Sequence, residues 1–300
     1  MTGGDKNFSP INGDDMEARV IQMILLGVAV ATVGVIQLGK KYWHAKTRNL
    51  YARLRQAQSP STCKTVDFSE LTPLPSPVQR YFQHVLKQGQ PIVQSVTLRH
   101  YGAFNVGNDQ ERWKPFTSEQ RVVTTPPGFV WNARVQMLPG MSVYVHDAYI
   151  AGEGILHAAM LGWFEVAALR GKEEIAKGEL MRFLAEAVWY PTALLPRQGL
   201  VWEAANESAA KAILTEGNLT LTLLFDFNAE GLIDTVTAET RGRTVADKII
   251  PTPWEGRFWD YRTHHGMRIP FAAEASWLLP AGRSPYWRGR LTQLTYGLAS

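Results

Sequence analysis

The sequence predicts a mainly β protein of the α+β class. A long antiparallel meander forms an open or half β-barrel, helices lie across its mouth, and one N-terminal transmembrane helix precedes it. Three observations predict this architecture: closely spaced strand-like segments after residue 91, two segments with helical periodicity, and one long uncharged run near the N-terminus. Because the turns between the strand-like segments are short, we expect neighbouring strands to pair antiparallel.

The uncharged run extends from Val20 to Leu38 and is the predicted transmembrane helix. About 20 apolar residues are needed to cross a hydrocarbon core roughly 30 Å thick. A cleaved signal peptide has a shorter apolar core of about 7–15 residues, whereas this run ends in a Gly-Lys-Lys sequence that is typical of a stop-transfer signal. The single cysteine, Cys63, lies too far along the chain to be a lipoprotein anchor. We therefore predict a single-pass membrane protein.

The side of the membrane follows from the basic residues beside this helix. Lysine and arginine are frequent between Lys40 and Arg55, and no acidic residue occurs there. The positive-inside rule places such a segment in the cytoplasm, so we predict a cytoplasmic soluble domain. The periplasmic side stays open as the alternative, because a lipid carrier sits more naturally outside the cytoplasm.

Four regions are predicted along the chain. Residues 1–19 form a disordered polar tail, residues 20–38 the transmembrane helix, residues 39–73 a basic juxtamembrane segment and linker, and residues 74–298 a β-rich globular domain. The hydrophobic content of 45% and the charged content of 19% are typical of a folded chain. The net charge of +4 is concentrated beside the membrane helix, so we predict no nucleic-acid interface.

Two helices are predicted in the globular domain. Ser76 and Pro77 are typical of a helix start, and the apolar residues that follow at helical spacing predict a helix that ends at Gly89. A second helix is predicted from Lys172 to Tyr190, where Pro191 ends it. We expect this second helix to lie across the mouth of the sheet.

The predicted strands fall into two blocks on either side of the second helix. They cover residues 93–106, 121–123, 128–137 and 142–150 in the first block, and 200–205, 209–214, 219–227, 232–243, 268–279 and 286–296 in the second. Long sheets that curve in this way enclose either a packed interior or an apolar cavity. The chain contains 10 Trp, which favours an aromatic-lined interior.

Several longer strings resemble the signature of an uncharacterised bacterial family, a domain of unknown function. They are AEAVWYPTALLP at 185–196, PTPWEGRFWDY at 251–261, GMRIP at 266–270 and PYWRG at 285–289. The resemblance covers residues 74–296 and implies no established activity. The strand rhythm of residues 128–156 is also similar to the lipoprotein-carrier (LolA/LolB-like) fold, which implies an open β-barrel that holds acyl chains. Likeness of fold alone does not transfer function.

Residues 251–257 form the first candidate site. Two prolines stiffen the segment, and a glycine between Glu255 and Arg257 permits an unusual backbone conformation. One interpretation places Glu255 and Arg257 at the rim of the cavity beside Trp254, where Arg257 clamps a carboxylate or phosphate head group with its forked guanidinium. The other interpretation is a structural Glu255–Arg257 ion pair that braces a loop, with Trp254 in the core.

The second predicted helix supplies further candidates. Glu179, Arg182 and Glu186 share one helical face. Such a set is typical either of an acid/base pair with an orienting cation or of a solvated ladder of ion pairs. Trp189 and Tyr190, at the end of the helix, are expected to line the core or the cavity.

Asp147 is the remaining candidate. It shares one face of its predicted strand with apolar residues, so we expect it to point inward, with Arg134 or Arg288 as its partner. We predict no metal site, because the adjacent His264 and His265 would face opposite sides of a strand. We also predict no cofactor, because the sequence lacks the nucleotide- and metal-binding motifs.

Three functions fit this pattern. The first is a membrane-tethered domain that binds a lipid or another hydrophobic small molecule in an apolar cavity. The second is an enzyme that acts on such a ligand with Glu255, Glu186 or Asp147 as acid or base, and the sequence does not decide whether there is catalysis. The third is a structural or assembly factor of a membrane complex, whose protein partner the sequence does not identify.

Overall fold

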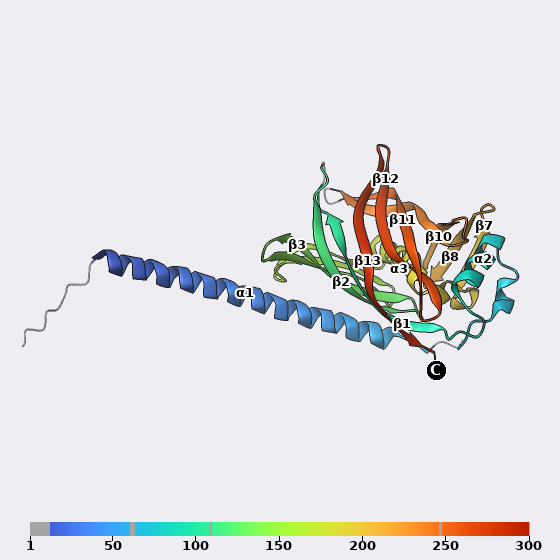
Figure 1. The fold of residues 1–300 in the computed structure, drawn as a ribbon, viewed down its shortest axis with the longest axis horizontal. Helices are drawn as coiled ribbons and strands as arrows, with labels where there is room; N and C mark the ends of the chain where they lie inside the picture. Colours follow the sequence, from blue (N-terminus) through green and yellow to red (C-terminus); the bar gives the residue numbers. More distant parts are fainter. Residues whose placement is uncertain (1–12, 61–63, 108–109, 246–247, 300) are drawn as a thin grey trace, which may run out of the picture.

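One antiparallel sheet of 13 strands makes up most of the protein (Figure 1). The computed structural model describes residues 13–60, 64–107, 110–245 and 248–299. The first strands are β1 (Val93–Asn105), β2 (Trp113–Val123), β3 (Gly128–Leu138), β4 (Met141–Ile150), β5 (Glu153–Met160) and β6 (Phe164–Gly171). The later strands are β7 (Leu200–Ala204), β8 (Ala209–Glu216), β9 (Leu219–Phe227), β10 (Ile233–Val245), β11 (Lys248–His264), β12 (Met267–Leu279) and β13 (Gly282–Leu298).

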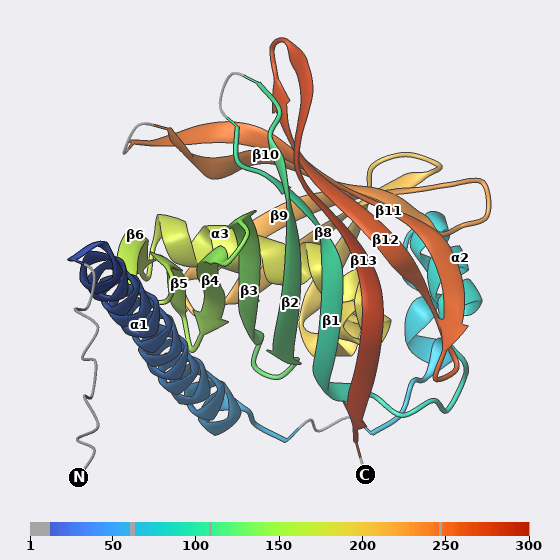
Figure 2. The ribbon, with the colours of Figure 1, turned by 60° about the vertical axis from the view of Figure 1, so that its left-hand side comes forward.

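The sheet is a meander that does not close into a complete barrel. Each strand pairs with its chain neighbour within β1–β6 and within β7–β13, and β13 returns to pair antiparallel with β1. This order leaves β6 and β7 as the two edges. The predicted antiparallel sheet that stays open is thereby confirmed. The curvature visible in Figure 2 gives the sheet a concave inner face and a convex outer face.

Some strands differ from the prediction. β5 and β6 are absent from the sequence prediction, because neither shows a regular alternation of buried and exposed residues. Parts of both faces of β5 are buried, and the edge strand β6 has no buried apolar face. Residues 251–257 belong to β11 and not to a loop. Pro251 and Pro253 precede the first β11–β12 pair, Trp254 with Trp277, so their missing N–H groups interrupt no ladder with β12.

The two predicted helices are present and shorter than expected. α2 (Ser76–Val85) ends before Gly89, and α3 (Glu174–Glu186) gives way to short 3₁₀ turns. These turns are η2 (Ala187–Trp189), η3 (Pro191–Leu194) and η4 (Pro196–Gln198), while η1 (Phe68–Leu71) precedes α2. α3 contacts β3–β6 and also β9 and β10, so it lies between the two halves of the curved sheet (Figure 2).

The long helix α1 (Gly13–Ala57) packs its C-terminal part on the outer face of β2, β3 and β4. Trp43 is 1% exposed, its ring stacks on His146 with centroids 4.0 Å apart, and its Nε1 donates to Asn132 Oδ1 over 2.9 Å. Thr47 Oγ1 lies 2.8 Å from His146 Nε2, and Leu54 is buried in an apolar cluster with strand residues. The folded domain therefore begins before the predicted boundary at residue 74.

The N-terminal part of α1 projects away from the sheet (Figure 1). Across the described residues, no helix combines the length and the apolar character needed to span a membrane. The predicted transmembrane helix over residues 20–38 is thus not found. Of the predicted disordered tail, residues 13–19 are helical, and residues 1–12 lie outside the described part of the chain.

Candidate functional site

A cavity of about 950 Å³ lies between α3 and the inner faces of both halves of the sheet. This volume is at the upper end of the range for small-molecule sites, roughly 300–1,000 Å³. Aromatic rings form much of the wall, and they belong to Phe104, Trp131, Trp189, Trp254, Phe258, Trp277, Tyr286 and Trp287. Strands from both predicted blocks therefore contribute to one aromatic interior.

Arg182 on α3 is the centre of a buried ion cluster in the cavity wall. Its Nη1 donates to Asp147 Oδ2 on β4 over 2.7 Å, and its Nε donates to Glu186 Oε1 over 2.7 Å. Gln120 on β2 donates to the other carboxylate oxygen of Glu186 over 2.6 Å. The guanidinium also lies over the ring of Trp131, 4.7 Å from its centroid. These charge-assisted hydrogen bonds tie α3 to two strands of the sheet.

Glu179 lies one helical turn before Arg182 and is buried in the same wall. Burial, followed by the charge of Asp147, raises the pKa of Glu179 to about 8. Burial also raises the pKa of Asp147, although the charge of Arg182 opposes the rise. At neutral pH the Glu179 carboxyl group therefore keeps its proton and is a hydrogen-bond donor. A protonated acid in a cavity, close to two other carboxyl groups, is typical of a functional site.

Several buried polar atoms at or behind the cavity wall have no hydrogen-bond partner among the described residues. They are Glu179 Oε2, Asp147 Oδ1, Gln120 Oε1, Trp131 Nε1, Trp287 Nε1 and His100 Nε2. His100 lies behind the wall against the ring of Trp189, and burial lowers its pKa to about 3, so the imidazole is neutral. Buried polar groups are normally paired, and four of these six residues, Glu179, Asp147, Trp131 and Trp287, line the cavity, where a bound molecule can supply a partner.

Several of the predicted site residues line this cavity, namely Asp147, Glu186, Trp189 and Trp254. The Nε1 of Trp189 donates to the carbonyl oxygen of Pro270 over 3.0 Å, and the Nε1 of Trp254 donates to the hydroxyl oxygen of Tyr286 over 2.9 Å. These hydrogen bonds hold both indole rings in place, with their apolar surfaces available to the cavity.

Tyr190 does not line the cavity. Its side chain is fully buried, and its hydroxyl donates to the carbonyl oxygen of Phe183 over 2.9 Å. The chain turns sharply between η2 and η3 at this residue, which sends the Tyr190 ring into the packing beside α3 while Trp189 faces the cavity.

Glu255 and Arg257 lie outside the cavity, which corrects the predicted rim clamp. Successive side chains of a strand alternate between faces, so Trp254, Gly256 and Phe258 face the cavity and Glu255 and Arg257 face away. Arg257 is exposed, and no carboxylate forms an ion pair with it within the described part of the chain. Gly256 has an ordinary backbone conformation, and its missing side chain leaves room for the Trp254 ring, which a Cβ atom would approach to 3.0 Å.

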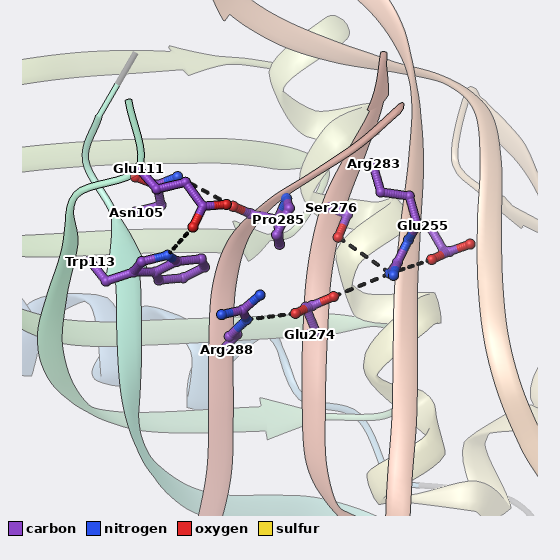
Figure 3. A network of polar contacts seen from close by, with 9 residues as sticks. All are labelled: Asn105, Glu111, Trp113, Glu255, Glu274, Ser276, Arg283, Pro285 and Arg288. Atoms are coloured by element: carbon purple, nitrogen blue, oxygen red, sulfur yellow. Dashed lines mark hydrogen bonds and ion pairs between the residues drawn. The ribbon is translucent and has the colours of Figure 1, made fainter. Parts of the chain in front are cut away.

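The partner of Glu255 is Arg283, in an ion pair of 2.6 Å on the outer face (Figure 3). Arg283 also lies 3.2 Å from Glu274, and Arg288 Nε donates to the other oxygen of Glu274 over 2.6 Å. Both arginines are more than a third exposed. Exposed ion pairs contribute about 0–1 kcal/mol each, so this network mainly braces the β11–β13 surface, and of its members only Glu274 also reaches the cavity lining as the structure describes it.

The predicted partners of Asp147 are also corrected. Arg134 donates to Ser142 Oγ over 2.9 Å, and Arg288 pairs with Glu274, whereas Asp147 pairs with Arg182 of α3. The predicted solvated ladder on this helix is a buried cluster, because the side chains of Arg182 and Glu186 are each only 14% exposed.

Among the cavity residues that the sequence prediction did not name are Arg241 and Arg243 on β10. The sequence could have indicated them, because Arg241 and Arg243 flank Gly242 and therefore share one face of the predicted strand. No group of three potential metal ligands gathers within the described ranges. Of the two adjacent histidines, His264 is in β11 with its Nε2 3.0 Å from the carbonyl oxygen of Leu294, and His265 is in the turn that follows.

These features define an α+β protein whose open antiparallel sheet encloses a helix and a ligand-sized cavity. The chain belongs to a family of unknown function, DUF6920, whose model matches residues 72–296. This range contains every one of the signature strings quoted above, so the resemblance to an uncharacterised family is confirmed. No curated protein matches the chain.

The solved structures that are similar to this chain include the following two. The LolA superfamily protein NE2245 from Nitrosomonas europaea shares 6% sequence identity at a TM-score of 0.37, over 73% of this chain and 91% of that one. The β-barrel-like protein of the domain of unknown function DUF1849 from Brucella abortus shares 10% identity at a TM-score of 0.22, over 69% of this chain and 99% of that one.

Proposed function

We propose that this protein binds one hydrophobic or amphiphilic small molecule, such as a membrane lipid, in the cavity beside α3. The observation that carries the proposal is the cavity itself, about 950 Å³ in volume with an aromatic wall. Ligand sites are typically concave and mostly apolar, with a few polar groups that fix the orientation of the ligand. The unpaired polar atoms of Glu179 and Asp147 supply such groups.

We also propose that α1 attaches the domain to a membrane. Large apolar side chains of its N-terminal part, among them Ile24, Leu25 and Leu26, are 59–66% exposed and have no protein surface to cover them. Exposed apolar surface of this extent favours transfer into lipid, by roughly 25 cal/mol per Å² removed from water. Lys40 and Lys41 follow at the position where they reach anionic head groups. From the basic residues that follow this segment we propose that the domain faces the cytoplasm, as the positive-inside rule favours, and the periplasm is the alternative.

An enzyme acting on the bound molecule is the alternative function. It is favoured by Glu179, which burial keeps protonated at neutral pH as a general acid should be, and by the neighbouring carboxylates of Asp147 and Glu186. A Glu179→Gln variant that retains bound lipid but loses a cellular function would favour this alternative.

The membrane and ligand proposals are tested together by comparing the full chain with a chain of residues 36–300, which retains the packing of Gly39 and Trp43 against the sheet. The full chain is expected to sediment with membranes after a high-salt wash, and the shorter chain to stay in the supernatant. Organic extraction of the shorter chain, purified without detergent, should release about one lipid-like molecule per chain on mass spectrometry. A shorter chain that is folded and carries no such molecule would contradict the ligand proposal.

A further inference from the structure

Arg241 and Arg243 lie side by side on the inner face of the long β10–β11 hairpin. In the register of these strands Arg241 is opposite Thr252 and Arg243 is opposite Ile250, two positions that share the face of Trp254. Both arginines line the cavity. The cavity therefore has a cationic rim on β10, whereas the sequence prediction placed the rim on residues of the neighbouring strand β11.

Both guanidinium groups are held against tryptophans of the cavity wall. Arg241 lies over the ring of Trp254, 5.1 Å from its centroid, and Arg243 lies over the ring of Trp277 at 5.9 Å. Stacking of this kind fixes the plane of a guanidinium while the N–H groups at its edge stay available for hydrogen bonds. The two forks are therefore oriented before any ligand arrives.

The charges of these two arginines are unpaired, unlike those of most arginines in the sheet. Arg283 and Arg288 of β13 each have a carboxylate within ion-pair distance, as does Arg182 of α3. Over the described ranges no carboxylate forms an ion pair with Arg241 or Arg243. Two half-buried cations without an ion pair in one wall of a cavity favour an anionic occupant.

The acids near the rim do not neutralise these charges. Asp147 and Glu186 are hydrogen-bonded to Arg182. Burial raises the pKa of Asp147 and of Glu179 and the charge of Arg241 lowers it in part, but neither carboxyl group lies within ion-pair distance of Arg241. Glu179 is protonated at neutral pH, because burial raises its pKa to about 8. Glu111 and Glu174 reach the lining from exposed positions, and the carboxylate of Glu111 accepts a hydrogen bond from the indole of Trp113 (Figure 3). Glu274, which also reaches the lining, is paired with Arg283 and Arg288.

We infer that Arg241 and Arg243 bind the anionic head group of an amphiphile, a carboxylate or a phosphate, whose apolar part occupies the aromatic cavity. The inference rests on the proposed ligand-binding function and specifies its ligand class. The forked donors of two arginines match the oxygens of either anion. The protonated Glu179 adds a further donor in the same wall of the cavity.

The test uses the full-length chain and photoreactive probes that share one diazirine-bearing dodecyl chain and differ only in the head group. The heads are carboxylate, phosphate, hydroxyl and ammonium, and the readout is the half-saturating concentration for labelling peptides that line the cavity. The carboxylate or the phosphate probe is expected to label at a concentration at least about tenfold lower than the hydroxyl probe, since one charge-assisted contact exceeds the 1.4 kcal/mol that a factor of ten requires. Their relative strength distinguishes a free fatty acid from a phosphate-bearing lipid.

Arg241→Gln and Arg243→Gln should each weaken this preference for anions, and the double variant should abolish it. Arg257→Gln is the matched control, since it removes an unpaired arginine from the outer face of the adjacent strand, and it should leave the preference unchanged. Arg241→Lys keeps the positive charge but lacks the forked donors, so it should give an intermediate preference for anions. This variant also tests the inference if a glutamine variant does not fold.

Equal labelling by the hydroxyl and anionic probes, or a loss in Arg257→Gln as large as in Arg241→Gln, would overturn the inference. The hydroxyl probe separates this failure from failure of the proposed function. Saturable labelling of the cavity by the hydroxyl probe in every variant keeps the ligand-binding function and rejects only the head-group assignment. Labelling by none of the probes would reject both.

Discussion

Replacing Arg182 with methionine is expected to lower the free energy of unfolding by about 3–5 kcal/mol, the usual cost of removing one partner from a buried ion pair. Arg182 donates hydrogen bonds to both Asp147 and Glu186 over 2.7 Å, and all three side chains are less than a fifth exposed. Methionine fills a similar volume, so the loss reports mainly the two carboxylates left without a cation. Urea denaturation at pH 7 measures it.

The matched control for this prediction is Arg257→Met, which removes an exposed arginine that has no ion pair within the described part of the chain. Its effect should stay within about 0.5 kcal/mol. The loss in Arg182→Met should shrink in acid, because burial raises the pKa of Asp147, which then takes up a proton and is no longer a buried charge. A loss below about 1 kcal/mol at pH 7 would show that the cluster does not hold α3 against the sheet.

Glu179→Gln is expected to change how stability depends on pH. The pKa of Glu179 is raised from 4.5 to about 8 in the folded chain, mainly by burial. Between these two values the folded chain holds a proton that the unfolded chain releases, so the stability of the wild type falls as pH rises through this window. The fall is at most about 5 kcal/mol, at 1.36 kcal/mol per pKa unit. Glutamine does not titrate, so the variant should gain stability relative to the wild type from pH 5 to pH 8.

Denaturation curves at several pH values between 5 and 8 test this prediction. Glu203→Gln, which changes an exposed glutamate of β7, is the control and should follow the pH dependence of the wild type. Parallel curves for Glu179→Gln and the wild type would mean that the Glu179 carboxyl group is ionised in the folded protein. The cavity would then contain a negative charge at the position where the structure indicates a neutral donor.

Most of the sheet could be predicted from the sequence, because alternation of apolar residues and short turns are local signals. β10 and β12 illustrate this, since their predicted segments lie almost entirely within the observed strands. β6 could not be predicted, because an edge strand on the surface has no buried face to produce alternation. The packing of α1 could be predicted in part from the sequence. Trp43, Thr47, Leu50 and Leu54 follow helical spacing, but the dense lysines and arginines between them suggested a basic segment beside a membrane.

The candidate site was predictable only where a residue's own strand or helix decides its position. Asp147 faces inward, as its neighbours on β4 indicate, but its partner Arg182 comes from a helix 35 residues away in sequence, and no local pattern reveals that contact. Glu255 and Arg257 were misplaced because two prolines suggested a loop. Once the segment is recognised as a strand, alternation from the inward Trp254 sends both of them outward.

Gly178 offers the most direct test of the cavity as a ligand site. It lines the cavity from α3, and a Cβ atom built on it meets no other atom within 4 Å. A phenylalanine at this position therefore extends into the cavity without a backbone clash and occupies part of the space that a ligand needs. Replacing a glycine inside a helix also stabilises it, by roughly 0.5–1 kcal/mol in the case of alanine.

The decisive measurement is the amount of lipid-like molecule per chain, obtained by organic extraction and mass spectrometry of the 36–300 chain in three forms: wild type, Gly178→Ala and Gly178→Phe. The wild type and the alanine variant should carry about one molecule per chain. The phenylalanine variant should be folded, with a melting temperature no lower than that of the wild type, and should carry almost none. A folded Gly178→Phe chain with as much bound molecule as the wild type would show that the ligand lies elsewhere and would contradict the central claim.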